Sequence, residues 1–372
     1  MTTTGALRVC VSAGEPSGDR HAAALLQALQ ERRPDVQVEG VGGERMAAAG
    51  ASLLERIESL SAMGFAEPLT RLVAHASVLR RLRTRFLERQ YDLVILVDYP
   101  GFNLQVARAA AAANIPTLYY VAPQAWAWGL GRADRLRRTV QGLAVILPFE
   151  EAFFRSRGVP ARFVGHPLMD VPYPGRAAAR AALGLNAASQ VLALVPGSRP
   201  SEVRRLWPVM RGAARRLRTM RPGLEVVVAA VSGCEYPGSD EFCLSRAGAN
   251  DALAAADCAL CKAGTATLEA ALVGVPSVVV YRTDPWSYLV ARRVARVPFV
   301  GLVNLLAGRA VVPELIQRDA RVEPIVGATL PLLDPNGAAA RVQRATYERI
   351  RMQLGGPGAA RRTAAWALEL VA

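Results

Sequence analysis

The sequence predicts an α/β protein made of two doubly wound domains, and three observations support this fold class. At 372 residues, the chain is long for a single core, so two domains of ordinary size are expected. Short apolar runs typical of buried parallel strands recur along it, each followed by a Gly- or Pro-containing loop and a helical pattern. Half of the residues are hydrophobic but only 6% are aromatic, which fits alternating strands and helices rich in Ala, Leu and Val.

Charge and cysteine content narrow the class of protein further. The net charge of +14 suits nucleic acid, an anionic membrane or phosphorylated substrates, but its source is an arginine excess that also indicates compositional bias. The sequence shows no export signal and no apolar run long enough to span a membrane, so we expect a cytoplasmic protein with free thiols. Cys258 and Cys261 have the spacing of metal ligands, but they lie in a predicted strand whose positions three apart face opposite sides.

The first predicted strand, residues 6–12, runs into a polar loop that contains Gly14, Glu15, Ser17 and Asp19, and a helix follows from about residue 20 to 32. Open α/β sheets bind ligands at the carboxyl ends of their strands, so this loop is a candidate site. The alternative is that Ser17 or Asp19 only caps the helix.

A second candidate lies where the apolar run 93–97 ends at Asp98. In a parallel sheet Asp98 falls at the same edge as the Glu15 loop, and a partly desolvated carboxylate there could take a proton from a hydroxyl group. Its alternative role is to cap the turn that follows. Trp126 and Trp128 follow the strand 117–121 and are expected to line a sugar or acyl site.

The basic segment 68–90 predicts a long helix with apolar residues at helical spacing. Such a helix either covers the sheet or lies on an anionic membrane with Phe65, Leu69 and Leu72 inserted. The proline-rich segment that begins at His166 predicts a linker. We therefore expect domains at 1–165 and 166–340, with C-terminal helices at 341–372 that pack on the first domain or on a partner subunit.

The second half repeats the strand-loop-helix order, with strands near 191–195, 225–230, 257–261 and 277–281. Two of its loops suit a diphosphate, because free N–H groups at a helix start favour anions and a cationic side chain is present in each. An ordinary capped helix is the alternative for both. The residues of these loops are Gly197, Ser198 and Arg199 in the first and Lys262, Gly264, Thr265, Thr267 and Glu269 in the second.

The two halves together suit transfer of a group from a nucleotide. Asn304 and Glu314 follow a further apolar strand and are expected to close over the same nucleotide, while Glu269 could accept the ribose hydroxyls. The sequence offers no Asp-x-Asp pair for a divalent ion, so leaving-group charge would fall to helix N-termini, Arg199 and Lys262. We expect neither a metal nor another cofactor.

Nine short motifs in order, between about residues 8 and 320, resemble the lipid-A-disaccharide synthase family. They occupy residues 13–19, 63–64, 98–103, 123–128, 147–150, 165–167, 196–199, 264–269 and 304–309. The resemblance implies a GT-B type fold, in which two Rossmann-like domains face one another across a cleft. It also implies inverting transfer of 2,3-diacylglucosamine from UDP-2,3-diacylglucosamine to the 6-hydroxyl of 2,3-diacylglucosamine 1-phosphate, giving a β-1,6-linked disaccharide and UDP.

The resemblance implies a location and roles as well. The expected location is the inner face of the inner membrane, as a peripheral protein on its anionic surface, without nucleic acid; a homodimer is also allowed. Asp98 would be the base, with Glu15 as the alternative. The acceptor side would be formed by Gly14, Ser17, Asp19, Met63, Asn103, Trp126 and His166, and the nucleotide side by Gly197, Ser198, Arg199, Lys262, Gly264, Thr265, Thr267, Glu269, Asn304 and Glu314.

Two departures from the family pattern affect these expectations. Residues 232–250 are irregular, which leaves the uracil contacts open. His75 and Ala76 stand where bulkier apolar residues are expected, so an alternative membrane contact is Leu206, Trp207 and Met210.

The sequence also leaves two rival functions. One is another UDP-sugar enzyme of the same fold, such as a 2-epimerase or a transferase with a soluble acceptor; the other is a non-catalytic lipid-binding protein.

Overall fold

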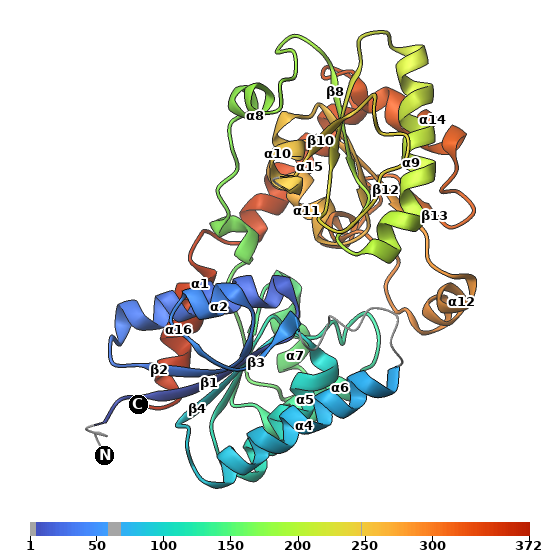
Figure 1. Cartoon of the computed structure of the whole chain (residues 1–372). Helices are drawn as coiled ribbons and strands as arrows, with labels where there is room; N and C mark the ends of the chain where they lie inside the picture. The colour runs from blue at the N-terminus through green and yellow to red at the C-terminus, as the bar shows by residue number, and fades with distance from the viewer. Residues whose placement is uncertain (1–4, 59–67, 247) are drawn as a thin grey trace. The chain divides into compact units, whose positions relative to one another are not determined.

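The computed structural model describes residues 5–58, 68–246 and 248–372 (Figure 1). The chain divides into unit 1, which contains Met1–Asp170 and Leu354–Ala372, and unit 2, which contains Val171–Gln353. The sequence analysis grouped residues 341–372 into one C-terminal segment, whereas the structure divides them. Helix α15 belongs to unit 2, and only the final helix, α16, returns to unit 1.

The described part of unit 1 forms a seven-stranded parallel sheet in the order β3-β2-β1-β4-β5-β6-β7. The strands are β1 (Arg8–Ala13), β2 (Gln37–Gly42), β3 (Ser52–Arg56), β4 (Leu93–Val97), β5 (Thr117–Tyr120), β6 (Gly142–Val145) and β7 (Ala161–Phe163). The helices are α1 (Pro16–Arg32), α2 (Glu44–Ala48), α4 (Pro68–Leu87), α5 (Pro100–Ala112), α6 (Gly131–Thr139), α7 (Pro148–Arg155), η1 (Pro167–Asp170) and α16 (Ala359–Glu369).

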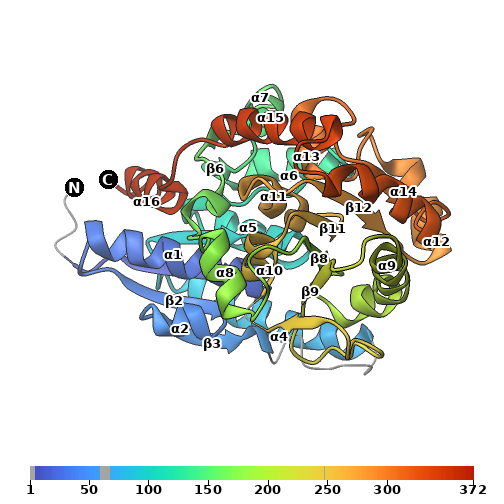
Figure 2. The same cartoon turned by 90° about the horizontal axis from the view of Figure 1, so that it is seen from above.

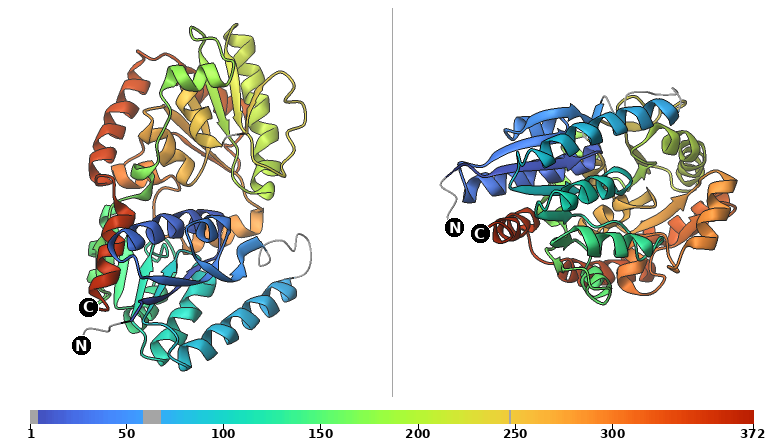
Figure 3. Two further views of the ribbon diagram at one scale, coloured as in Figure 1. Left: turned by 60° about the vertical axis from the view of Figure 1, so that its left-hand side comes forward. Right: turned by 90° about the horizontal axis from the view of Figure 1, so that it is seen from below.

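Alternating strand residues build one core on each face of this sheet. Val9 and Val11 pack with the buried leucines of α1 and with Trp366 of α16, while Cys10 packs on the opposite face with Leu82 of α4. This alternation follows from the two-residue period of a strand, and it explains why the central strands are apolar throughout. Figure 3 shows the red helix α16 beside the blue helix α1.

Within its described residues, unit 2 forms a six-stranded parallel sheet in the order β10-β9-β8-β11-β12-β13, part of which is labelled in Figure 2. The strands are β8 (Val191–Val195), β9 (Glu225–Ala229), β10 (Cys243–Ser245), β11 (Cys258–Lys262), β12 (Ser277–Tyr281) and β13 (Glu314–Ile316). The helices are α8 (Arg176–Ala182), α9 (Pro200–Met220), α10 (Ala249–Ala255), α11 (Thr265–Leu272), α12 (Pro285–Val294), α13 (Leu302–Ala307), α14 (Val322–Leu333) and α15 (Ala338–Gln353).

Both sheets reverse their strand order once. In unit 1 the chain winds outward through β1, β2 and β3 and then returns to place β4 beside β1; in unit 2 it winds through β8, β9 and β10 and returns to place β11 beside β8. Ligands of open α/β sheets bind outside the carboxyl ends of the strands at such a reversal, which we call the switch point. The predicted α/β class with two doubly wound domains is confirmed.

Two helices of unit 1 begin at a proline, and the first of them begins before the predicted residue 20. Helix α1 begins at Pro16 and α5 at Pro100, because the fixed φ of proline suits the first helical position. Ser17, Asp19 and Asn103 therefore lie in first helical turns and not in open loops.

Candidate active site

The switch point of unit 1 brings the Glu15 loop and Asp98 to one edge of the sheet. Ala13 of β1 pairs with Val97 of β4, so Gly14 and Asp98 leave neighbouring strands at the same level. Gly14 is buried, and a methyl group at its Cα would collide with the ring of Tyr99. Only glycine therefore allows this ring to cover the loop.

Asp98 sits on a turn that few side chains adopt. Asp98 and Tyr99 have φ angles of 48° and 51°, and a left-handed non-glycine residue costs on the order of 1 kcal/mol. Three hydrogen bonds hold the main chain of Asp98: its N–H donates to the Tyr120 carbonyl (3.0 Å), and its carbonyl accepts from the Tyr119 hydroxyl (2.6 Å) and from Asn103 Nδ2 (2.8 Å). These bonds thus fix the position of the Asp98 main chain, which carries the half-buried carboxylate.

Asn103 is fully buried and acts inside the protein. Its Oδ1 accepts from the Ser12 hydroxyl (2.7 Å), and its Nδ2 also donates to the carbonyls of Ser12 (3.1 Å) and Val97 (3.2 Å). These bonds join the ends of β1 and β4. Asn103 was predicted to contact substrate, and the observed bonds make it a positioning residue for the Asp98 turn.

His75 is a partner of this turn that the sequence analysis missed. Its Nε2 lies 2.7 Å from the Tyr99 hydroxyl, and its ring contacts both Tyr99 and Phe102. The only sequence signal was a polar residue among the apolar positions of α4. The contact links this basic helix to the strained turn.

The three polar residues predicted in the first loop differ in burial and in their contacts. Glu15 is the half-buried N-cap residue of α1, and Ser17 is exposed. Asp19 is buried, and its carboxylate accepts the N–H groups of Gly43 (2.7 Å), Arg45 (3.1 Å) and Met46 (3.1 Å). Asp19 thus caps α2, a helix other than its own.

Two further residues predicted to bind substrate lie in the core. Trp126 is 8% exposed and donates its indole N–H to Glu150 Oε1 (2.9 Å), whereas Trp128 is 42% exposed. Trp126, which was expected to line a sugar or acyl site, is therefore buried. Burial raises the pKa of Glu150 to about 7. His166 is also buried; its Nδ1 accepts the Leu168 N–H (3.1 Å), and burial lowers its pKa to about 3.

The residues predicted to contact a membrane are only partly described. Met63 of the acceptor set and Phe65 lie outside the described residues, while Leu69 and Leu72 lie on the backbone of α4. The alternative contact at Leu206, Trp207 and Met210 is wrong, because all three side chains pack in the core of unit 2. None of the described helices is both long and apolar enough to cross a bilayer.

The switch point of unit 2 places two helix starts side by side. Val195 of β8 pairs with Cys261 of β11, so the loops that follow these strands leave the sheet together. Gly197 has a φ of 134°, Arg199 is the exposed N-cap residue of α9, and Pro200 begins the helix. This geometry leaves main-chain N–H groups at the start of a helix of 21 residues, which is favourable for an anion.

The Glu202 carboxylate of the protein itself lies in this anion-binding environment. Glu202 Oε2 accepts the N–H of exposed Ser198 (3.0 Å), and its Oε1 lies 2.9 Å from Lys262 Nζ. Burial alone would raise the pKa of Glu202, but the Lys262 ammonium and the Ser198 N–H outweigh it and hold the pKa below its usual range. The local field therefore stabilises negative charge.

The second loop of unit 2 is a shorter version of the first. Gly264 is the N-cap residue of α11 with a φ of 131°, and Thr265 is exposed. Thr267 is buried and donates its hydroxyl to the Gly264 carbonyl (2.8 Å), so it stabilises the loop. Glu269 lies half-buried one turn into the helix.

Asn304 and Glu314 bind each other and the loops around them. Asn304 Nδ2 donates to Glu314 Oε1 and to the Val312 carbonyl (both 2.8 Å), and its Oδ1 accepts the N–H groups of Val311 and Val312. Glu314 also accepts the N–H of Gly301 (3.0 Å). Both residues are positioned to shape a loop of unit 2, and Asn304 is buried.

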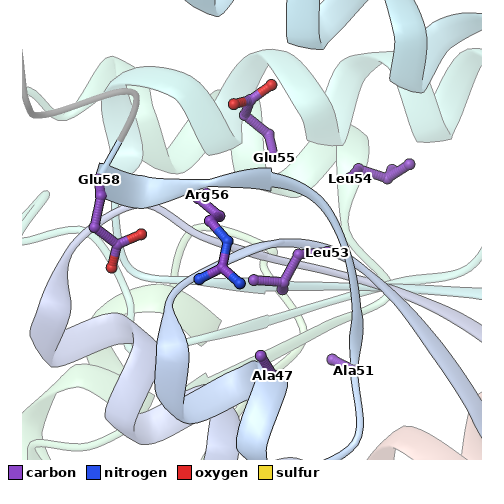
Figure 4. Close-up of a pocket in the computed structure, with 7 residues that line it drawn as sticks. All are labelled: Ala47, Ala51, Leu53, Leu54, Glu55, Arg56 and Glu58. Atoms are coloured by element: carbon purple, nitrogen blue, oxygen red, sulfur yellow. The ribbon is translucent and has the colours of Figure 1, made fainter.

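Unit 1 has a hollow of about 680 Å³ beside β3, and Figure 4 shows the side chains that line it. Among the described residues, its lining includes none of the predicted site residues. In the same described ranges, no three His, Cys, Asp or Glu side chains are grouped as metal ligands.

Comparisons with known proteins identify the family of this chain. The family model described as lipid-A-disaccharide synthetase matches residues 9–369. A lipid-A-disaccharide synthase of Myxococcus xanthus is 43% identical over 374 residues and one of Anaeromyxobacter dehalogenans 42% over 367, covering 98% and 96% of this chain and 97% and 96% of the relatives.

A fold comparison gives the same architecture. The crystal structure of CalG4, the calicheamicin glycosyltransferase, has a TM-score of 0.64 and 16% identity, and the match covers 99% of both chains. At this identity the likeness concerns the fold alone. Because the family model spans nearly the whole sequence and the relatives are more than two-fifths identical over nearly their full length, the chain belongs to the lipid-A-disaccharide synthase family.

Proposed function

We propose that this protein transfers 2,3-diacylglucosamine from UDP-2,3-diacylglucosamine to the 6-hydroxyl of 2,3-diacylglucosamine 1-phosphate, forming the β-1,6-linked disaccharide 1-phosphate and UDP. One observation carries the proposal beyond family membership. The switch points of the two units differ in chemistry: unit 1 has the Asp98 carboxylate on a turn whose main chain is held by hydrogen bonds, and unit 2 has cationic loops rich in N–H groups.

The chemistry divides between the units accordingly. The Asp98 carboxylate takes the proton of the acceptor hydroxyl while that oxygen forms its bond to the anomeric carbon of the donor. The bond between that carbon and the diphosphate oxygen breaks on the opposite side, which inverts the configuration. The diphosphate displaces Glu202 from the Ser198 N–H and from Lys262. These two groups and Arg199 then stabilise the charge that develops on UDP. Glu15 is the alternative base.

The lipid substrates require access to a membrane surface, and α4 supports a peripheral association with the inner face of the inner membrane. This helix carries Leu69 and Leu72 near its start, and Val73 is 70% exposed. Arginines at 71, 80 and 83 would attract anionic headgroups, whereas Arg81 and Arg85 are paired with Glu55 and Glu39. Phe65 belongs to the same proposed contact.

A mass-spectrometric assay with both acylated sugars tests the proposal. We expect the disaccharide 1-phosphate and UDP in equal amounts. Full activity with UDP-N-acetylglucosamine and an unacylated acceptor would instead favour a transferase with a soluble acceptor, and conversion of the donor alone would favour a 2-epimerase. Lipid binding without any product would leave only the non-catalytic alternative.

A further inference from the structure

Helix α12 of unit 2 presents its apolar side to solvent. Trp286, Leu289, Val290 and Val294 follow one another at positions i, i+3, i+4 and i+8, so they form a single stripe along the helix. All four are exposed, and Trp286 is 78% exposed. In Figure 1, α12 lies on the loops that follow β12, apart from the body of unit 2.

A similar helical spacing of apolar residues has the opposite outcome in α9 of this unit. There Val203, Leu206, Trp207 and Met210 occupy i, i+3, i+4 and i+7, and all are buried against the sheet. Single exposed apolar residues are ordinary on protein surfaces, but a stripe of four that includes a tryptophan marks an interaction face. We therefore expect the exposed stripe of α12 to be covered by a binding partner.

Charge identifies the kind of occupant. Residues 285–300 contain three arginines, Arg292, Arg293 and Arg296, and no acidic residue. All three arginines are exposed, and Arg293 lies between Leu289 and Val294 on the apolar side of the helix. An aliphatic arginine stem can lie along apolar surface while its guanidinium reaches phosphate, and tryptophan prefers the boundary between headgroups and acyl chains.

We propose that α12 docks on the surface of an anionic phospholipid bilayer. Trp286, Leu289, Val290 and Val294 enter the headgroup region, and Arg292 and Arg293 contact lipid phosphates. This contact belongs to unit 2 and is separate from the α4 contact of unit 1. It does not depend on the proposed sugar chemistry.

Vesicle co-sedimentation tests this surface. We expect Trp286→Ser/Leu289→Ser/Val290→Ser to bind vesicles of phosphatidylcholine and phosphatidylglycerol about tenfold more weakly than the native chain. Arg292→Gln/Arg293→Gln should lose a similar factor on these vesicles and none on phosphatidylcholine alone. Met352→Ser is the matched control, since Met352 is 75% exposed on α15 of the same unit; it should bind like the native chain.

A spectroscopic test uses the native α12 and the emission of its own tryptophan. Of the five tryptophans, Trp126, Trp207 and Trp366 are buried, so in a Trp128→Phe background Trp286 is the residue whose emission responds to the surface. Anionic vesicles should shift its emission to shorter wavelength and protect it from an aqueous quencher. The further change Trp286→Phe should abolish both effects.

Several outcomes would overturn the proposal. These are native-like vesicle binding by the serine variant, or a Trp286 that stays equally quenched with vesicles present. Unchanged vesicle binding together with a halved mass in light scattering would assign the stripe to a second copy of the chain. Turnover of detergent-dispersed substrates is measured separately, so a protein that binds through α12 but makes no disaccharide would contradict only the proposed function.

Discussion

The two switch points have the same topology, but they fix different groups. In unit 1 the chain leaves β4 through the non-glycine residues Asp98 and Tyr99 in left-handed geometry, and buried hydrogen bonds hold the turn. In unit 2 it leaves β8 and β11 through Gly197 and Gly264, and a helix follows at once. A strained turn fixes one side chain in space, whereas a glycine turn exposes main-chain N–H groups. One sheet edge is thus suited to a base and the other to a diphosphate.

The strongest test of this contrast is Asp98→Asn. The change keeps the shape of the side chain but removes the base, so turnover should fall by about 10² to 10⁴. UDP affinity, measured by calorimetry, should be unchanged. Asp92→Asn is the matched control, because Asp92 precedes the same strand at the opposite edge and accepts the Arg8 N–H (2.8 Å). Retained turnover in Asp98→Asn would transfer the role of base to Glu15.

The reciprocal change in unit 2 is Arg199→Ala. Loss of a cation beside the diphosphate should raise the Kd for UDP by about 10- to 100-fold, as expected for hydrogen bonds to charged groups. Arg204→Ala, an exposed arginine further along the same helix, should leave the Kd unchanged. Equal affinities of the native chain and Arg199→Ala would remove Arg199 from the nucleotide site.

Lowering the pH should destabilise unit 1 more than unit 2, because all three histidines lie in unit 1. Burial lowers the pKa of His21 to about 4 and that of His166 to about 3, from 6.5. As pH falls below 6.5, the unfolded chain binds protons that the buried rings do not, so the free energy of unfolding of unit 1 decreases. By pH 5.5 the loss should be about 1 kcal/mol per ring. Glu150 of the same unit offsets part of it, because its raised pKa makes the folded state bind the additional proton over this pH range.

Hydrogen exchange at pH 7 and 5.5, corrected for the intrinsic rate, measures this loss in each unit. His21→Gln/His166→Asn should reduce it. A loss of the same size in both units would show that the histidines are not its source.

The smallest expected effect concerns the support of the Asp98 turn. Tyr119→Phe removes the hydroxyl that donates to the Asp98 carbonyl and should lower the free energy of unfolding by about 1 kcal/mol. Tyr347→Phe in unit 2 removes a comparable buried bond to Gln343 (2.6 Å) and serves as the control. Only Tyr119→Phe should also reduce turnover, by a few-fold. Equal turnover in the two variants would mean that the turn does not position the base.

The switch-point loops could be predicted from sequence because their signals are local. An apolar strand that runs into Gly197, Ser198 and Arg199, or that ends at Asp98, contains within ten residues the strand, the turn and the helix start. The short edge strands β3, β10 and β13 carry weaker signals, because their residues are mostly half-buried.

Residue roles that depend on distant partners could not be predicted. Trp126 is buried because Glu150, 24 positions away, accepts its N–H, and Asp19 is used by a helix that begins at Glu44. Periodicity also cannot show whether an apolar stripe faces a core or solvent, since α9 and α12 have similar patterns and differ in burial. These properties arise only when the chain is packed.

The return of α16 to unit 1 has a consequence for biosynthesis. Trp366, Ala364 and Ala367 complete an apolar core that is otherwise built by residues before 165. During translation this core stays incomplete and exposed to solvent while all of unit 2 is synthesised. Unit 2 can therefore mature first, and the ribosome-bound N-terminal half is the stage at which a holdase chaperone would be most needed.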